Sequence, residues 1–200
     1  MSTKYDNSAV NEWSFATRSL HAGQNLDGST NARNVPIYQT TSYVFNDAEH
    51  AANRFGLSDA GPIYTRLTNP TQDALEERLA SLEGGVAAVA FASGQAAETA
   101  AILNLASAGD HIVASPRLYG GTSTLFTVTL KRLGIDVTLV DNPDDPTSWQ
   151  DAVQPNTKAF YGETFGNPVA DVLDIPAIAE VAHKNLVPVS YTHLTLPTKA

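Results

Sequence analysis

The sequence predicts an α/β fold in which helices cover both faces of a mainly parallel sheet, a three-layer α/β/α arrangement. Short apolar segments recur roughly every 25 residues from residue 86 onward, and segments with a helical period separate them. This alternation is typical of β–α–β units, in which a helix joins parallel strands. The chain of 200 residues, 42% of them hydrophobic, is long enough to bury a core between such layers.

Residues 1–62 are expected to form an extended N-terminal arm. The segment 18–46 is rich in Gly, Asn, Thr and Ser and has no long helical period. Only the run 35–45 is apolar enough to pack. Because such a segment cannot build its own core, we expect the arm to lie on its own domain or, more specifically, on a partner subunit.

The first long helix is predicted to begin after Asn69. Asn69 is a suitable N-cap, and Pro70 fits the first helical position, where its missing N–H costs nothing. Three leucines follow at helical spacing, and Gly84 and Gly85 end the helix.

The remaining elements alternate between strands and helices. The apolar run 86–91 is predicted to be a strand, and an Ala- and Leu-rich helix follows it to about Ala108. The sequence further predicts strands over 111–115, 135–140, 158–163 and from 187, and helices over 122–133 and 176–185. These elements form one domain over residues 63–189.

The terminal segment 190–200 breaks this pattern. It is polar, threonine-rich and interrupted by Pro197, where a buried parallel strand should be apolar. We interpret it as a non-native tail that packs poorly. The alternative is an edge strand.

Composition excludes several classes of function. A net charge of −9 argues against binding to nucleic acid or to an anionic membrane, both of which need excess basic charge. The absence of cysteine excludes disulfide scaffolds and thiolate sites. No histidine pair has the spacing of a metal site, and no signal peptide or membrane span is evident. We therefore expect a cytoplasmic protein without a metal centre.

Two segments carry residues suited to binding an anion. Ser93, Gly94 and Gln95 stand between a predicted strand and a helix, where backbone N–H groups and the helix dipole favour negative charge. Taken alone, such a segment is more often a simple turn. Tyr64 and Arg66 offer a hydroxyl and a planar cationic fork, although a surface arginine beside a packed tyrosine is the alternative.

Two further segments follow predicted strands. Tyr119 stands on a glycine-rich turn, where it can stack on a flat ligand or instead be buried. Glu163 and Asn167 lie at the carboxyl end of a predicted strand, the edge at which open α/β sheets bind ligands.

Together these segments resemble the Cys/Met-metabolism (transsulfuration) family of pyridoxal-phosphate enzymes. The resemblance covers residues 14–189, and the motifs occur in the family's order over 15–24, 35–45, 63–71, 91–95, 119–121 and 163–168. It implies a truncated fold type I large domain, like that of aspartate aminotransferase, with pyridoxal 5'-phosphate as cofactor. It also implies a homo-oligomer, a dimer of dimers.

The resemblance implies roles for the phosphate-binding residues. Tyr64 and Arg66 are expected to reach across a dimer interface to the cofactor phosphate of the neighbouring subunit. Ser93, Gly94 and Gln95 are expected to hold the phosphate of their own subunit.

The resemblance also implies roles around the cofactor ring. Tyr119 is expected to stack on the pyridine and is the one candidate for a catalytic role in this chain. Asn167 is expected near the phenolic oxygen of the cofactor. Glu163 is expected to orient the residues that contact the cofactor without contacting it itself.

The chain departs from the family pattern near its end. Thr192 stands where the family has an aspartate that holds the pyridine nitrogen, and the Schiff-base lysine is expected beyond the end of the chain. Lys199 is not expected to be catalytic, and Lys158 and Lys184 are interpreted as solvated.

Gln95 and the segment 64–70 favour the sulfhydrylase branch of the family. That branch replaces the acetate of O-acetyl-L-homoserine by sulfide or a thiol, giving homocysteine or methionine. Cystathionine γ-synthase, γ-lyase and an O-acetylserine-using sulfhydrylase remain alternatives. So does a catalytically inactive unit that only binds phosphate or dimerises.

Overall fold

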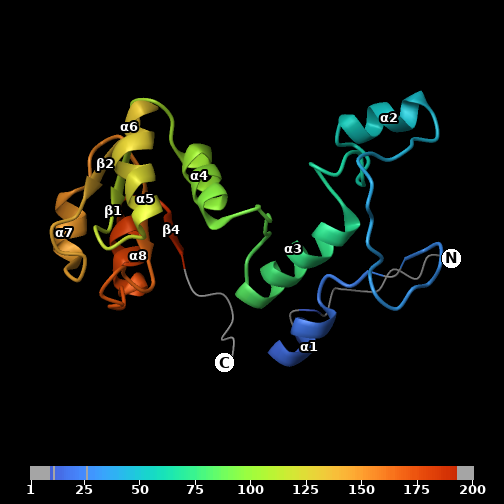
Figure 1. The fold of residues 1–200 in the computed structure, drawn as a ribbon, viewed down its shortest axis with the longest axis horizontal. Helices are drawn as coiled ribbons and strands as arrows, with labels where there is room; N and C mark the ends of the chain where they lie inside the picture. Colours follow the sequence, from blue (N-terminus) through green and yellow to red (C-terminus); the bar gives the residue numbers. More distant parts are fainter. Residues whose placement is uncertain (1–9, 11, 26, 193–200) are drawn as a thin grey trace. The chain divides into compact units, whose positions relative to one another are not determined.

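The structure, a computed structural model, describes residues 10, 12–25 and 27–192 (Figure 1). The chain divides into two compact units, Met1–Ala90 and Phe91–Ala200. The first unit thus extends beyond residue 62, where the arm was expected to end, because it includes the long helix and the segment after it.

The described residues of the first unit form the α-helices α1 (Phe15–His21), α2 (Ala48–Phe55) and α3 (Pro70–Glu83). The first two interrupt the segment that was expected to be extended. Local capping explains both, since the Ser14 and Asp47 side chains accept hydrogen bonds from the N–H groups three residues on, at 3.2 and 2.7 Å.

Helix α3 has the predicted bounds. The Asn69 Oδ1 accepts a hydrogen bond from the N–H of Thr71 at 3.0 Å, and Gly84 ends the helix with a φ of +67°. The chain leaving α1 passes α3 closely at Gly23, where an added Cβ would overlap the carbonyl oxygen of Ala74.

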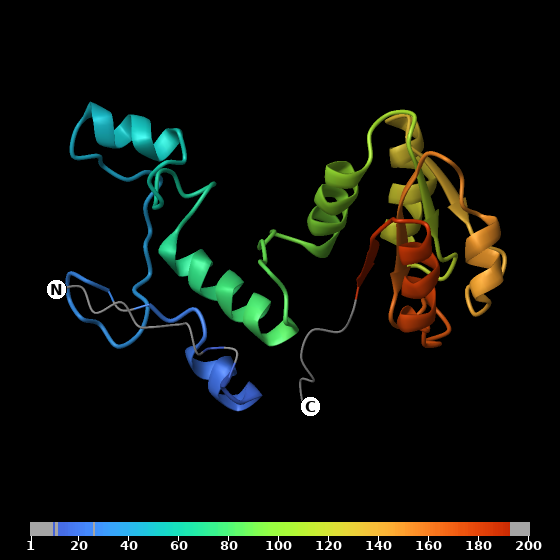
Figure 2. The same ribbon diagram turned by 180° about the vertical axis from the view of Figure 1, so that it is seen from behind.

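The second unit is built on a four-stranded parallel sheet, which confirms the predicted fold class (Figure 2). Its strands are β1 (His111–Ala114), β2 (Asp136–Leu139), β3 (Thr157–Glu163) and β4 (Val189–Thr192), in the order β2-β1-β3-β4. Because all four strands are parallel, their carboxyl ends meet at one edge of the sheet.

Helices cover both faces of this sheet. Helix α4 (Gly94–Leu105) and a continuous run made of α5 (Gly120–Thr124), the π-helical turn η2 (Leu125–Thr129) and α6 (Leu130–Arg132) pack on one face. Helices α7 (Pro146–Asp151) and α8 (Ile175–Lys184) pack on the other. The three-layer arrangement is therefore confirmed.

Alternation along the strands separates two cores. Tyr161 of β3 points to the α4 side, where its ring lies 4.6 Å from that of Phe126. Phe160, the preceding residue, points to the other side and lies 5.4 Å from the ring of Trp149. Since both faces are covered, β1 is buried along its whole length.

The prediction of a strand over 86–91 is wrong. This segment is irregular, and none of the described residues pairs with it as a strand. Val86, Val89 and Phe91 are exposed. The apolar composition fits a strand, but a strand also needs a hydrogen-bonding neighbour, which composition does not reveal.

The sheet continues further along the chain than expected. Ser190, Tyr191 and Thr192 pair with β3 as part of β4, so these three residues belong to an edge strand. The rest of the predicted tail, including Lys199, lies outside the described residues.

A buried histidine lies at the opposite, amino edge of the sheet. The two ring nitrogens of His111 lie 2.9 Å from the Thr157 hydroxyl and 2.8 Å from the Thr138 hydroxyl. Burial lowers the pKa of His111 below its ordinary value of 6.5, and the nearby Asp136 carboxylate offsets part of this effect.

This lowered pKa predicts a loss of stability in mild acid. Below pH 6.5 the unfolded chain binds a proton that the folded chain resists, so the free energy of unfolding should fall, by at most about 1.4 kcal/mol per pH unit. Urea titrations at several pH values check this. The His111→Gln variant should lose this component, whereas the exposed His183→Gln should keep it; parallel pH profiles for the wild type and His111→Gln would contradict the assignment.

Among the described residues, no helix is long and apolar enough to cross a membrane. Within residues 10, 12–25 and 27–192, no three or more His, Asp or Glu side chains come together in a way that could hold a metal ion.

Candidate functional site

A pocket of about 360 Å³ opens at the carboxyl edge of the sheet. It is lined by Ser93, Gly94, Gln95, Glu98, Tyr119, Glu163 and Thr192. These residues come from the start of α4, the turn before α5 and the last residues of β3 and β4. This is the edge at which open α/β sheets bind ligands.

The start of α4 presents backbone donors to the pocket. Ser93 is the N-cap, and its hydroxyl oxygen accepts a hydrogen bond from the N–H of Ala96 at 3.1 Å. The N–H groups of the first helical turn have no partner within the helix, and the helix dipole adds positive potential there. This turn is therefore suited to an anion such as a phosphate.

The Gln95 side chain joins α4 to α5. Its Nε2 donates to the Glu98 Oε2 at 2.9 Å and to the Thr122 hydroxyl at 3.1 Å. The same hydroxyl donates to the Glu98 Oε2 at 2.9 Å. Two donors thus compensate the charge of a carboxylate that lines the pocket.

Glu98 and Thr122 were not among the site residues predicted from the sequence. Glu98 lies three residues after Gln95 in the predicted helix, so the two side chains are expected on one face of that helix. This spacing was the signal available for Glu98. No signal of this kind indicates Thr122, which lies 27 residues from Gln95.

Glu163 fixes the backbone of Tyr119. The N–H of Tyr119 donates to the Glu163 Oε1 at 2.8 Å, while Tyr119 as a whole is 56% exposed. Burial raises the pKa of Glu163, the Tyr119 N–H counteracts this, and the nearby Glu98 carboxylate adds to the rise. The tyrosine ring is therefore available to a ligand while its backbone is held.

Gly121 allows this placement of the tyrosine. A Cβ added at Gly121 would lie 2.6 Å from a carbon of the Tyr119 ring and 3.3 Å from the Gln95 amide carbon. Any larger residue at this position must displace one of the two side chains.

Tyr161 lies beside this pocket. It precedes Glu163 by two residues on β3, so both side chains point to the same face of the sheet. Its side chain is 1% exposed, and its hydroxyl has no hydrogen-bond partner among the described residues. Burial, followed by the nearby Glu98 carboxylate, raises the pKa of this hydroxyl, which keeps it protonated.

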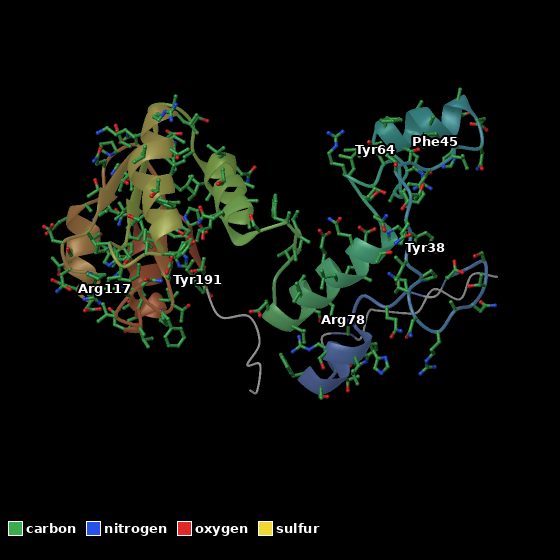
Figure 3. The ribbon with its side chains drawn as sticks, viewed as in Figure 1. Tyr38, Phe45, Tyr64, Arg78, Arg117 and Tyr191 are labelled. Atoms are coloured by element: carbon green, nitrogen blue, oxygen red, sulfur yellow. The ribbon has the colours of Figure 1, made fainter. Side chains whose placement is uncertain are left out.

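The other predicted site residues lie elsewhere. Asn167 is exposed on the loop after β3 and does not line the pocket. Tyr64, labelled in Figure 3, and Arg66 belong to the first unit. The Arg66 guanidinium lies 5.4 Å from the centre of the Tyr64 ring. An antiparallel bridge between Ser42 and Tyr64 holds this segment against the arm.

No lysine lines the pocket among the described residues. Lys158 lies at the start of β3, where its Nζ is 3.7 Å from the Asp110 carboxylate, and Lys184 ends α8. Thr192 does line the pocket, at the position where the family resemblance places an aspartate.

Comparison with curated proteins gives closely similar sequences. The chain is 73% identical over 185 residues to the O-acetyl-L-homoserine sulfhydrylase of Corynebacterium glutamicum. The aligned segment covers 92% of this chain and 42% of that protein. It is also 56% identical over 172 residues to the O-acetyl-L-homoserine sulfhydrylase of Leptospira meyeri. That alignment covers 86% of this chain and 39% of the Leptospira protein. The chain therefore spans about two-fifths of the length of these relatives.

Solved structures agree with this similarity. A putative O-acetylhomoserine (thiol)-lyase from Campylobacter jejuni, with N'-pyridoxyl-lysine-5'-monophosphate in its chain, matches with a TM-score of 0.85 and 41% identity. The match covers 90% of this chain and 44% of that chain. The cystathionine γ-lyase of Lactobacillus plantarum matches with a TM-score of 0.79 and 36% identity, over 90% and 44% of the two chains.

A sequence model of one family, the Cys/Met metabolism PLP-dependent enzymes, matches residues 16–192. This range contains every residue of the pocket as well as Tyr64 and Arg66. The chain belongs to the Cys/Met metabolism PLP-dependent enzyme family.

Proposed function

We propose that the complete protein is a pyridoxal-phosphate-dependent O-acetyl-L-homoserine sulfhydrylase. It replaces the acetate of O-acetyl-L-homoserine by sulfide or a thiol and so produces homocysteine or methionine. The observation that carries the proposal is the pocket at the carboxyl edge, which joins an anion-binding helix start to an exposed tyrosine in a chain with close relatives of that name.

The start of α4 suits the phosphate of this cofactor. The first-turn N–H groups of Gly94 and Gln95 would donate to the phosphate oxygens, and the Ser93 hydroxyl lies at the same helix end. The Glu98 carboxylate opposes an anion, but Gln95 and Thr122 already donate to it. The residues present therefore fit a phosphate at this position.

The turn before α5 suits the cofactor ring. Tyr119 would stack on the pyridine, with its backbone held by Glu163. When bound, pyridoxal phosphate supplies the electron sink that stabilises the carbanions of a γ-replacement. The part of the described residues is to bind the phosphate and to orient the ring.

The segment that carries Tyr64 and Arg66 completes the site from a neighbouring subunit. Tyr64 and Arg66 are adjacent and exposed, so they can donate to a phosphate outside their own unit. The proposal therefore includes a homo-oligomer, a dimer of dimers.

The proposal has three further parts. Asn167 is assigned to the same site, near the phenolic oxygen of the cofactor. We place the enzyme in the cytoplasm. Its small-molecule substrates are O-acetyl-L-homoserine and sulfide or thiols.

A second candidate applies to the 200 residues by themselves. They would then be a phosphate-binding, dimer-forming α/β unit without catalytic activity. The lining of the pocket favours it, since Thr192 replaces an expected aspartate and no lysine is present there among the described residues.

An activity assay tests the proposed function. The complete protein with pyridoxal phosphate, O-acetyl-L-homoserine and sulfide should release homocysteine and acetate in equal amounts. Cysteine in place of sulfide tests for cystathionine γ-synthase, O-acetyl-L-serine in place of O-acetyl-L-homoserine tests for the serine-specific enzyme, and cystathionine alone tests for γ-lyase. Faster turnover in any of these three assays would contradict the proposal.

The same assay separates the two candidates. The chain of 200 residues should make no homocysteine above the level produced by the free cofactor, because none of the described residues that line the pocket is a lysine that could hold the cofactor covalently or move protons. Turnover above that level would exclude the inactive unit.

A further inference from the structure

One arginine, Arg117, is labelled in Figure 3. It pairs with carboxylates on two other loops at the carboxyl edge of the sheet and so joins three loops. Arg117 lies on the loop after β1. Its Nη1 and Nη2 donate to the two carboxylate oxygens of Asp144, both at 2.9 Å, and Asp144 lies on the loop after β2. Its Nη1 also donates to the Asp171 Oδ2, on the loop after β3.

The first of these loops carries Tyr119, two residues after Arg117. The loop is fixed on both sides of the arginine, since the N–H of Arg117 donates to the Ser115 hydroxyl at 3.1 Å and Leu118 is buried. The position of the Arg117 backbone therefore determines where Tyr119 enters the pocket.

The third loop carries Asn167. The N–H of Gly166 donates to the Asp171 carbonyl oxygen at 2.8 Å, and the N–H of Ala170 donates to the Gly166 carbonyl oxygen at 2.7 Å. A Cβ added at Gly166 would lie 3.0 Å from the Arg117 Cβ and would overlap the Asp171 carboxylate. Arg117 and Asp171 thus pack directly against the residue before Asn167.

The second loop connects this cluster to the core. The carbonyl oxygen of Pro143, the residue before Asp144, accepts a hydrogen bond at 3.0 Å from the Nε1 of the buried Trp149. The loop that carries Asp144 is therefore anchored to the core. Because the Arg117 guanidinium binds Asp144, it can restrain the other two loops relative to this anchored loop. A lysine cannot reproduce this, since it lacks the planar fork that binds one carboxylate with two donors.

We propose that Arg117 is a positioning residue, which sets the placement of Tyr119 and Asn167 relative to each other through its pairs with Asp144 and Asp171. The inference rests on the proposed function for the assignment of those two residues to the cofactor. Arg117 itself does not line the pocket.

A positioning role for Arg117 can be distinguished from a role in global stability alone. The side chains of Arg117, Asp144 and Asp171 are 32%, 55% and 30% exposed, and ion pairs this exposed add little to global stability. Loss of Arg117 should therefore loosen the two loops far more than it lowers the midpoint of unfolding.

Amide hydrogen exchange measures the loops without the cofactor. In the complete protein, Arg117→Met should raise the exchange rates of the Tyr119 and Gly166 amides by about tenfold or more, because both are hydrogen-bond donors within these loops. Arg117→Lys should give a smaller increase, and Asp171→Asn should affect Gly166 more than Tyr119. Arg132→Met, in the last turn of α6, is the matched control and should change neither rate.

Cofactor binding measures the consequence for the site. Arg117→Met should weaken the affinity for pyridoxal phosphate by roughly three- to tenfold and alter the circular dichroism of the bound cofactor, while its thermal midpoint stays close to that of the control. Unchanged exchange in both loops would overturn the proposal. So would faster exchange with unaltered cofactor binding, or a loss of binding that only follows a lower thermal midpoint.

The two proposals fail in distinguishable ways. If the wild-type protein binds no pyridoxal phosphate, the proposed function is wrong, and the positioning role toward that cofactor is wrong with it. If the wild type binds the cofactor and Arg117→Met binds it equally well, only the positioning role is wrong.

Discussion

Replacing Trp149 by alanine is expected to destabilise the second unit by about 3–5 kcal/mol, the usual cost of removing a large aromatic side chain from a core. Trp149 is fully buried, packs against Phe160 and donates to the Pro143 carbonyl oxygen. Because domains are stable by only about 5–15 kcal/mol, this change should remove a large share of the stability. Urea unfolding followed by far-ultraviolet circular dichroism measures it.

Two further variants make this result specific. Trp149→Phe keeps most of the ring but leaves the Pro143 carbonyl without its donor, so it should cost about 1–3 kcal/mol. Val128→Ala, at a half-exposed position on η2, should cost no more than about 0.5 kcal/mol. A similar loss in all three variants would contradict the assignment of Trp149 to the core.

Arg66→Ala is expected to weaken cofactor binding by the complete protein about ten- to a hundredfold, which corresponds to one charge-assisted contact of roughly 1.5–3 kcal/mol. Equilibrium titration with pyridoxal phosphate measures the affinity. Arg33→Ala removes another exposed arginine of the first unit and should bind the cofactor normally.

Mixing variants shows whether Arg66 acts across an interface. Oligomers of Arg66→Ala alone and of Tyr119→Ala alone should both be defective. Mixed oligomers should regain activity, because a subunit with an intact Tyr119 would receive Arg66 from its neighbour. No recovery on mixing would mean that Arg66 serves its own subunit.

Local signals were sufficient to predict part of this structure. The bounds of α3 follow from Asn69, Pro70 and Gly84, whose effects act within a few residues. The strands β1 and β3 follow from apolar runs that the covered sheet requires. The short helices α1 and α2 were missed because their capping residues, Ser14 and Asp47, stand in a polar segment with no long period.

The pocket was only partly predictable for a different reason. Gln95, Tyr119 and Glu163 were identified individually, yet their connections through Glu98 and Thr122 depend on how α4 packs beside α5. The cluster around Arg117 joins residues 27 and 54 positions apart. Pairings of this kind arise from the folded topology, and no periodicity along the chain encodes them.

The place of the hydrogen-bonded His111 in the sheet bears on which substitutions this domain can accept without an effect on its pocket. His111, Thr157 and the Lys158–Asp110 pair lie at the amino edge of the sheet, whereas the pocket lies at the carboxyl edge. Substitutions at the amino edge can therefore raise or lower stability without touching a group that meets the ligand. A protein that loses stability while acquiring a new substrate preference at one edge can regain it at the other, which makes the amino edge the place to engineer robustness.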